Sequence, residues 1–231
     1  MGIVTIDEKH LFDIGDVIRE KGGRSGGIQP RYMASEFSDI VDEKQAVVDS
    51  IFEKTITEIH SNATSIGKYM FADCQNLITA DFPLATNMGE HSFSGCINLS
   101  NINFPLIGMV SKYAFQKCDS LESVVFPSAH TIAASAFIYS ANLKMVDLHC
   151  ATTIAANCFK TCQNLTTFIL RSNTRADMTL ANALNGTPIE SGSGYIYVPS
   201  SLVNEYKSAT NWSMYADKIR AIEDYPEITG G

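Results

Sequence analysis

Residues Phe71 to Leu77 read FADCQNL, and residues Phe93 to Leu99, one interval of 22 residues later, read FSGCINL. Three further copies of this stretch follow at the same interval. A fixed interval in the range of about 20–50 residues is the signature of a repeat architecture. The columns that keep the interval are Phe71, Phe93, Phe115, Phe137 and Phe159; Leu77, Leu99, Leu121, Leu143 and Leu165; Cys74, Cys96, Cys118 and Cys162, with Ser140 in the fourth slot; and Asn76, Asn98, Asn142 and Asn164, with Ser120 as the exception.

A strand pattern follows each copy. Leu99 is followed by Ile102 and Phe104 in the spacing leucine-x-x-apolar-x-apolar, and the same spacing recurs in the next three copies. Residues two apart on a strand point to the same side, so these residues face a core and those between them face outward. The pattern predicts that each 22-residue unit is one coil of a solenoid, whose strands form a parallel sheet stacked at roughly 4.8 Å per coil.

The outward strand positions are the ones that the repeat leaves free to vary, and small polar and amide side chains dominate among them. A row of such groups at strand spacing suits contacts with carbohydrate or protein, and the alternative is a sheet face that is merely solvated. The predicted binding residues are Thr79, Asp81, Asn101, Asn103, Ser123, Val125, Met145, Asp147, Thr167 and Ile169.

The two ends of the chain differ from the repeats. Thr5 and Glu8 have capping-box spacing before an apolar helical face that ends at Gly22, and Pro30 is placed to begin a second helix. After Leu170, a loop-rich stretch precedes a strand at 195–198, a short helix through Ala209 and a second helical stretch over 213–222. We therefore predict a helical attachment module over 1–43, the solenoid over 44–171 and a cap over 172–231.

The repeated unit Phe71-x-x-Cys74-x-Asn76-Leu77 resembles the BspA-type leucine-rich repeats over about residues 55–171. The resemblance implies an α/β solenoid: a right-handed leucine-rich repeat coil with a parallel β-sheet, here with N-terminal helices and a small C-terminal β/α cap. The family is abundant in surface and phage-borne proteins of anaerobic and gut bacteria. The segment Tyr195-Ile196-Tyr197-Val198-Pro199, followed by Tyr206-Lys207 and Asn211-Trp212-Ser213, resembles the terminal module often found after such repeats.

The N-terminal segment Ile14-Gly15-Asp16-Val17-Ile18-Arg19-Glu20-Lys21-Gly22-Gly23 is similar to a helical module that begins many tail-associated proteins of phages and prophages. This resemblance implies a phage tail or virion appendage protein, made in the host cytoplasm and carried on the virion. Its N-terminal helices would contact other virion proteins, and its solenoid would contact carbohydrate or protein on the bacterial host. The alternative is a cell-surface adhesin, attached to other surface proteins. In both cases the sequence leaves undecided whether the chain forms a homo-oligomer.

Charge and hydropathy exclude several classes of partner. The 231 residues carry 17 basic and 25 acidic side chains, for a net charge of −8, without a run of Lys or Arg longer than two. Nucleic acids and anionic membranes bind clustered positive charge, so neither is an expected partner. The start at Met1 lacks the basic and apolar regions of a secretory signal, and no stretch is long and apolar enough for membrane insertion. We therefore expect a soluble product made inside the cell.

No pattern typical of catalysis or metal binding is present. Four of the six cysteines belong to one repeat column, which favours packing and free thiols over a disulfide, and Cys150, Cys158 and Cys162 lack zinc-site spacing. The five histidines are scattered, and neither a phosphate-binding glycine loop nor a serine nucleophile elbow occurs. The sequence predicts a non-enzymatic protein without cofactor, catalytic residues or metal.

Overall fold

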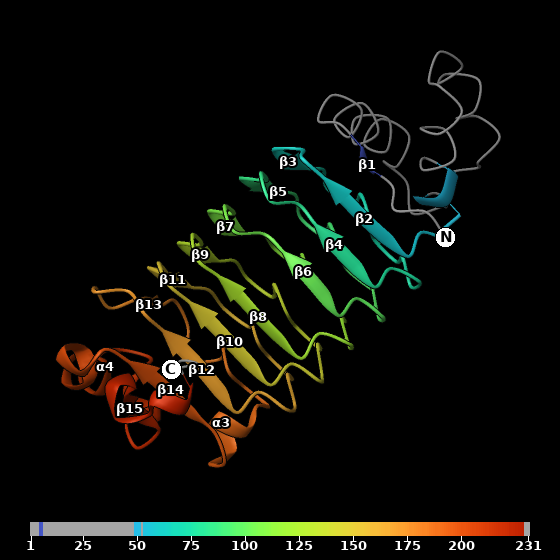
Figure 1. The fold of residues 1–231 in the computed structure, drawn as a ribbon. Coiled ribbons are helices and arrows are strands. Elements are labelled where there is room, and N and C mark those ends of the chain that lie inside the picture. The colour runs from blue at the N-terminus through green and yellow to red at the C-terminus, as the bar shows by residue number, and fades with distance from the viewer. Residues whose placement is uncertain (1–4, 7–48, 52, 229–231) are drawn as a thin grey trace.

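The computed structural model describes residues 5–6, 49–51 and 53–228. Successive coils stack along one axis, and each places one strand in a long parallel sheet and one short strand in a second row (Figure 1). The long sheet contains β1 Thr5–Ile6, β2 Glu58–Ser61, β4 Thr79–Asp81, β6 Asn101–Asn103, β8 Ser123–Phe126, β10 Met145–Leu148, β12 Thr167–Leu170, β14 Tyr195–Val198 and β15 Ile219–Ala221. The second row contains β3 Ser65–Ile66, β5 Asn87–Met88, β7 Met109–Val110, β9 Thr131–Ile132, β11 Thr153–Ile154 and β13 Asp177–Met178. Strand pairing is interrupted between β6 and β8 in the long sheet and between β5 and β7 in the second row.

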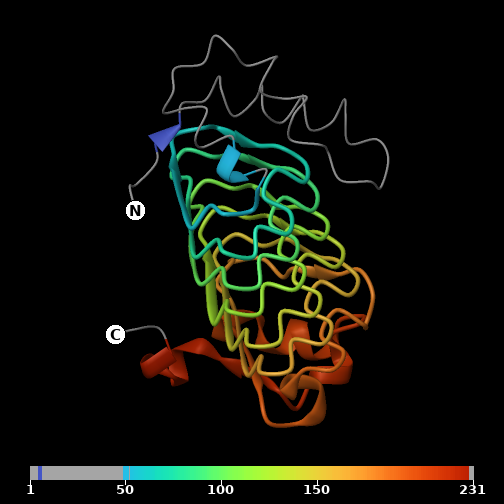
Figure 2. The same cartoon turned by 90° about the vertical axis from the view of Figure 1, so that its right-hand side faces the viewer.

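The register of the strands repeats the interval of the sequence. Thr79 pairs with Asn101, and Met145 pairs with Thr167, each one repeat apart and in parallel orientation. The register lengthens only where the repeat ends, because Thr167 pairs with Tyr195 across the loop-rich stretch. The predicted parallel solenoid is therefore confirmed. In the second view the successive coils lie one below another, from the coil of β2 to the C-terminal elements (Figure 2).

Stacked aromatic rings form the centre of the core. The ring centroids of Phe93 and Phe115 are 5.4 Å apart, and those of Phe115 and Phe137 are 5.1 Å apart, with nearly parallel planes. Every phenylalanine of this column is fully buried, as are the leucines of the neighbouring column. Stacking each residue on its own copy gives one continuous apolar spine, as the repeat columns predict.

The cysteine column forms hydrogen bonds across coils. The thiols of Cys96 and Cys118 donate to the carbonyl oxygens of Phe71 and Phe93, 25 residues earlier, at 3.0 and 3.2 Å. In the copy that lacks cysteine, the Ser140 hydroxyl donates to the carbonyl oxygen of Phe115 at 2.8 Å. This position therefore needs a small buried side chain that donates a hydrogen bond to a main-chain carbonyl oxygen of the turn. Serine meets the same need as cysteine, which explains why it can replace cysteine there.

Two further columns adopt a left-handed backbone that the sequence pattern did not indicate. Their φ values lie between 55° and 78° in every coil, and only one member is glycine. A positive φ costs a non-glycine residue free energy, so each coil keeps two strained turns that the surrounding stack holds in place. The columns are Tyr69, His91, Tyr113, Ser135 and Asn157, and Asp73, Gly95, Lys117, Tyr139 and Thr161.

The C-terminal residues continue the sheet and close its end. After α3 Pro188–Ser191 and β14 come η2 Ser200–Leu202, α4 Val203–Ser208, η3 Ser213–Tyr215, β15, η4 Ile222–Asp224 and η5 Pro226–Ile228. The predicted helix over 213–222 is therefore wrong: pairing of Ile196 with Ile219 draws its second half into a strand. Trp212 is fully buried and donates its indole N–H to the Ala176 carbonyl oxygen at 2.8 Å.

At the N-terminal end, Thr5 and Ile6 form β1, which pairs with His60 and Ser61 of β2. The helices predicted within 1–43 lie outside the described residues, and so does the boundary drawn at 43/44. In the part of the chain that the structure describes, no helix has the length and apolar character needed to cross a membrane.

Candidate binding surface on the outer sheet face

The outer sheet face is the side of the long sheet that is turned away from the phenylalanine spine. Along β8, Ser123 and Val125 are exposed whereas Val124 and Phe126 are buried, so the strand alternates between the two sides. The same alternation places Thr79, Asp81, Asn101 and Asn103 on this face with their side chains accessible to solvent. The structure thus brings together the predicted binding residues of β4, β6 and β8.

The C-terminal end of the outer sheet face is covered by residues that follow the repeats. The prediction that outward residues of every coil are available for binding is therefore wrong at this end. Ile169 is fully buried in a small apolar cluster with Tyr197 and Ile222, and Met145, Tyr225 and Ile228 pack against it. The ring centroids of Tyr197 and Tyr225 are 5.2 Å apart. The chain after β15 therefore lies over β10, β12 and β14 (Figure 1), and Ile169 cannot contact a ligand while it does.

Asp147 is also withdrawn from the surface, because it is ion-paired. Its residue is only 6% exposed, and both of its carboxylate oxygens accept hydrogen bonds from the Arg171 guanidinium, at 2.7 to 3.0 Å. His149 Nε2 lies 3.5 Å from Asp147 Oδ1. Since its acceptor groups are occupied, Asp147 is a structural residue. Thr167 and Met145 are half-buried at the margin of the covered area.

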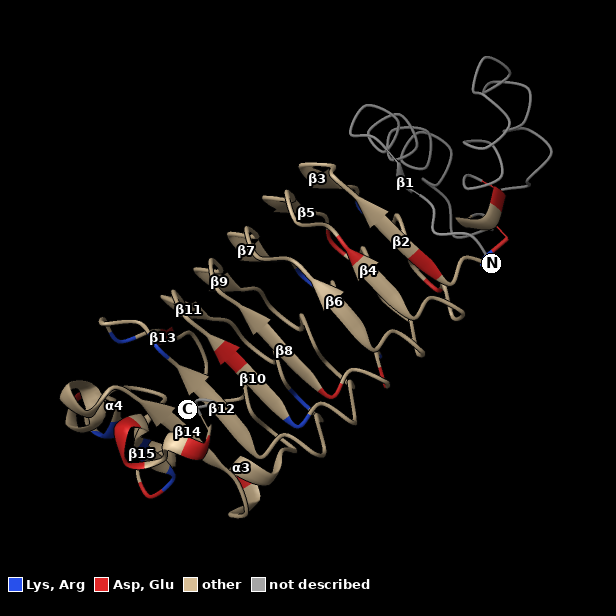
Figure 3. Cartoon of the chain, viewed as in Figure 1, with Lys and Arg blue, Asp and Glu red and all other residues tan. Residues whose placement is uncertain are grey.

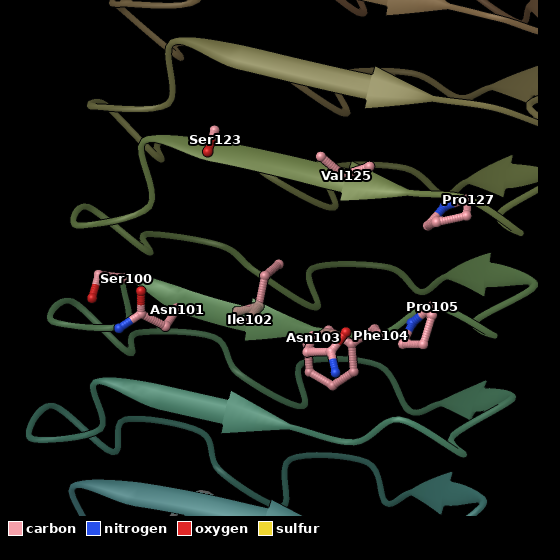
Figure 4. Close-up of a pocket in the computed structure, with 9 residues that line it drawn as sticks. All are labelled: Ser100, Asn101, Ile102, Asn103, Phe104, Pro105, Ser123, Val125 and Pro127. Atoms are coloured by element: carbon pink, nitrogen blue, oxygen red, sulfur yellow. The ribbon is translucent and has the colours of Figure 1, made fainter. Parts of the chain in front are cut away.

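The uncovered end of the outer sheet face is hollowed. A groove of about 410 Å³ lies between β6 and β8, and Figure 4 shows its lining residues. A second hollow of about 280 Å³ extends it toward β2. The two share Asn101, Ile102 and Asn103, so together they form one trough across the strands. The trough is further lined by Ser100, Phe104, Pro105, Ser123, Val125 and Pro127 on one side and by His60, Thr79, Ala80 and Asp81 on the other.

Hydrogen bonds between neighbouring coils hold the side chains of the second hollow. Asn103 Nδ2 donates to Asp81 Oδ1 at 2.8 Å, and His60 Nδ1 lies 3.0 Å from Asp81 Oδ2. The other ring nitrogen of His60 lies 3.8 Å from a carboxylate oxygen of Glu58. Both nitrogens of the ring therefore face carboxylates, and the imidazole links acidic groups of β2 and β4.

Charge on the outer sheet face lies beside the groove and not inside it. Glu58 and Asp81 are on β2 and β4, whereas β6 and β8 carry no charged residue (Figure 3). The groove therefore offers neutral amide, hydroxyl and main-chain groups. Such groups recognise uncharged polar ligands by hydrogen bonding.

Glu58, His60 and Ile102 belong to this surface but were not predicted from the repeat pattern. The register pairs Glu58 with Thr79 and His60 with Asp81, so these residues occupy the outward positions one coil earlier. The interval there is 21 residues, and a search at 22 does not align them. Ile102 was assigned to the core, but it is only partly buried at the floor of the groove.

Burial limits the reactivity of most of the cysteines. The six thiols are free, and all except Cys150 are buried. Burial raises the pKa of Cys74 to about 11 and the pKa of Cys162 to about 12, so the reactive thiolate is scarce at neutral pH. Within residues 5–6, 49–51 and 53–228, no group of three or more His, Cys, Asp or Glu side chains is arranged to hold a metal ion.

Comparison with known families identifies the repeat. The model of the BspA type leucine rich repeat region matches residues 47–166 and 86–209, with six copies. The chain belongs to this family. The match begins at residue 47, so it leaves the resemblance of Ile14–Gly23 to phage tail proteins unsupported. Among curated proteins, none matches the chain significantly.

One solved structure shares the fold of the chain, and others are similar to part of it. The pneumococcal vaccine antigen PcpA matches with a TM-score of 0.55 at 11% identity over 71% of this chain, which spans 39% of PcpA. A leucine-rich repeat protein of T. pallidum matches with a TM-score of 0.40 at 22% identity, over 50% of this chain and 67% of its own. A leucine rich cell surface protein of Faecalibacterium prausnitzii A2-165 matches with a TM-score of 0.37 at 20% identity, over 52% of this chain and 40% of its own.

Proposed function

We propose that the chain is a non-enzymatic binding module of a bacterial cell-surface protein, and that it contacts its partner through the open end of the outer sheet face. The observation that carries the proposal is the trough across β2, β4, β6 and β8, which is uncovered while the other end of the same face is buried. The partner is carbohydrate or protein on an opposing cell. A surface location agrees with the family and with the antigen character of PcpA, which shares the fold.

Three features of the trough support binding over catalysis. Its polar side chains are amides, hydroxyls, the Asp81 carboxylate and one imidazole that is held between carboxylates. It runs across the strands of several coils, so an extended polymer fits along it. Its backbone is fixed by the repeat while its outward side chains vary, which is how repeat proteins specialise a surface.

The proposal is tested with the full chain and a matched pair of variants. Asn101→Ala, Asn103→Ala and Ser123→Ala together remove polar groups of the trough, whereas Asn87→Ala, Lys112→Ala and Asn142→Ala remove exposed polar groups elsewhere on the coils of β4, β6 and β8. Labelled protein is added to intact eukaryotic and bacterial cells, before and after protease or periodate treatment, and bound fluorescence is measured.

We expect the trough variant to bind at least about tenfold more weakly than the other variant while both remain folded, with melting temperatures that differ little, because outward strand positions contribute little packing. Loss after protease treatment identifies a protein partner, and loss after periodate treatment identifies a carbohydrate. Equal binding by both variants and the unmodified chain would place recognition elsewhere and overturn the proposal.

A further inference from the structure

The long sheet is interrupted at the centre of the trough. β6 is the edge of a four-stranded sheet and β8 is the edge of a five-stranded sheet, although their coils are consecutive. One coil earlier, the Phe82 N–H donates to the Asn103 carbonyl oxygen and the Asn101 N–H to the Ile78 carbonyl oxygen, both at 3.0 Å. The matching bonds, from Phe104 to Val125 and from Ser123 to Ser100, are not formed among the described residues.

The same two coils remain joined away from this sheet. In the second row, β7 pairs with β9 in regular register. On the turn side, the Phe115 N–H donates to the Ala136 carbonyl oxygen at 2.8 Å, and the phenylalanine spine keeps its spacing. The rings of Phe82 and Phe104 stack at 5.7 Å, but among the described residues no ring contact joins Phe104 to Phe126. The opening is therefore local to the outer sheet, and we call it the strand gap.

Unpaired main-chain groups line the strand gap. In a parallel ladder the N–H and C=O groups of alternate residues point to the same neighbour, so those of Ser123 and Val125 point toward β6. Figure 4 shows the two strands facing each other across the gap, with these residues on one side and Ile102 on the other. An unpaired strand edge is a template for pairing with another chain.

The floor of the strand gap is apolar. The inward positions that correspond to Ile102 on the adjacent coils, Ala80 and Val124, are at most 1% exposed, whereas Ile102 is only partly buried. The groove of about 410 Å³ lies within the range of roughly 300–1,000 Å³ that is usual for ligand sites. Apolar contact is thus available below the main-chain groups, and neutral amides stand above them at Asn101 and Asn103.

We propose that the strand gap binds an extended, uncharged peptide segment of the partner, which hydrogen-bonds to the unpaired main-chain groups of β8 and places an apolar side chain on Ile102. This rests on the proposed function, since it names the partner of the same surface. An extended peptide matches the site because its N–H and C=O groups repeat at the strand rise of about 3.3 Å, and its side chains alternate between floor and solvent. A saccharide has hydroxyl groups but no such alternation of donors, acceptors and apolar groups.

The probes are acetylated five-residue amides that alternate threonine with one of valine, isoleucine, leucine, phenylalanine or tyrosine. Each has a control in which alternate amide nitrogens are methylated, which removes the donors and keeps the side chains. Amide hydrogen exchange of the full chain is measured at single-residue resolution. Without peptide, we expect the amides of Phe104, Ser123 and Val125 to exchange at least about tenfold faster than those of Phe82 and Asn101, which are paired.

With at least one unmethylated peptide at millimolar concentration, exchange at Ser123 and Val125 is expected to slow by about tenfold or more, and the methylated peptide has no effect. Val125→Pro then removes a donor that the fold does not use, on a strand residue whose predecessor is already extended. It is expected to weaken peptide binding by about tenfold, whereas Val125→Thr, which keeps the N–H, binds as the unmodified chain does.

Each other outcome overturns the peptide proposal. These are protected amides in the free protein, no slowing by any peptide, or equal binding by the methylated forms. If Val125→Pro fails to fold, as judged by circular dichroism, the methylated peptides alone decide the question. The failure is distinguishable from that of the proposed function. If the alanine variant of Asn101, Asn103 and Ser123 loses binding to cells while peptides have no effect, side chains of the trough recognise the partner; if cell binding is also unchanged, both proposals are wrong.

Discussion

Replacing Phe115 with alanine tests whether the phenylalanine spine carries the stability of the solenoid. Phe115 is fully buried, and four rings surround it: those of Phe93 and Phe137 at 5.4 and 5.1 Å, and those of Phe104 and Phe126 at 5.9 and 6.2 Å. Removing a buried phenylalanine costs about 3–5 kcal/mol, and neighbours that are themselves stacked into fixed columns can relax little. We therefore expect a loss near the upper end, at about 4–5 kcal/mol.

The assay is urea unfolding followed by two probes. Circular dichroism reports on the whole solenoid, and fluorescence of Trp212, the single tryptophan, reports on the C-terminal end. Leu106→Ala is the control, because Leu106 is 45% exposed and its truncation should cost less than about 1 kcal/mol. Coincident transitions permit a single free energy of unfolding, whereas separated transitions mean that the coils unfold in parts.

A loss below about 1 kcal/mol for Phe115→Ala, with coincident transitions, would refute the reasoning. It would mean that the ring column contributes no more than a surface side chain. Phe137 has ring neighbours on both sides as well and should respond in the same way.

Three further predictions rest on the burial or contacts of particular side chains, and a fourth concerns the N-terminal segment. Native protein should react with a thiol reagent first at half-buried Cys150, and unfolded protein should titrate as six free thiols; fewer than six without reductant would contradict the absence of disulfides. Ser140→Ala should destabilise by about 1–3 kcal/mol because it leaves the Phe115 carbonyl oxygen without its donor, whereas Ser140→Cys should cost less; equal losses in thermal melts would show that the donor is irrelevant. Arg171→Met should cost about 3–5 kcal/mol, since it leaves the Asp147 carboxylate buried and unpaired, and Arg171→Met with Asp147→Leu should recover most of that loss. Removal of residues 1–43 should leave a folded solenoid that no longer attaches to the other surface proteins of the cell that makes it. Normal attachment of the truncated chain to these proteins would disprove an attachment role for that segment.

The solenoid could be predicted from sequence because several columns of residues repeat at the same interval of 22 residues. Phe93 predicts the position of Phe115, and both predict the register of β4 with β6, which the structure confirms. An error at one residue is corrected by the other columns. The inward side of the strands was therefore predictable residue by residue, apart from Ile102.

The covering of the outer sheet face could not be predicted in the same way. It depends on contacts between residues that do not repeat, such as Tyr225 with Tyr197 and Ile228 with the cluster around Ile169. One signal was present in the sequence. Ile169 and Tyr197 are large apolar residues at outward strand positions, and such residues indicate a surface that another segment covers.

The strand gap also has a signal in the sequence, although the repeat pattern conceals it. β6 reads Asn101-Ile102-Asn103, and asparagine is disfavoured in strands, whereas β8 reads Ser-Val-Val-Phe. The apolar pattern is intact at both strands, so a search for core positions treats them alike. The difference lies in the outward positions, where strand propensity and cross-strand pairs contribute to sheet stability.

The position of the strand gap suggests how a repeat protein can open a site without losing its fold. Contacts in a solenoid are made mainly between neighbouring coils, so the free-energy cost of separating β6 from β8 stays local. On the opposite side of the same coils, the ring stacking of Phe93, Phe115 and Phe137 and the pairing of β7 with β9 are unchanged. The spine therefore fixes the distance between coils, and the outer sheet can exchange internal hydrogen bonds for bonds to a ligand. A substitution that strengthens β6, such as Asn101→Val with Asn103→Thr, should close the gap, slow exchange at Val125, raise the melting temperature and weaken binding of the partner. If the gap closes and binding of the partner does not change, the strand gap has no part in recognition.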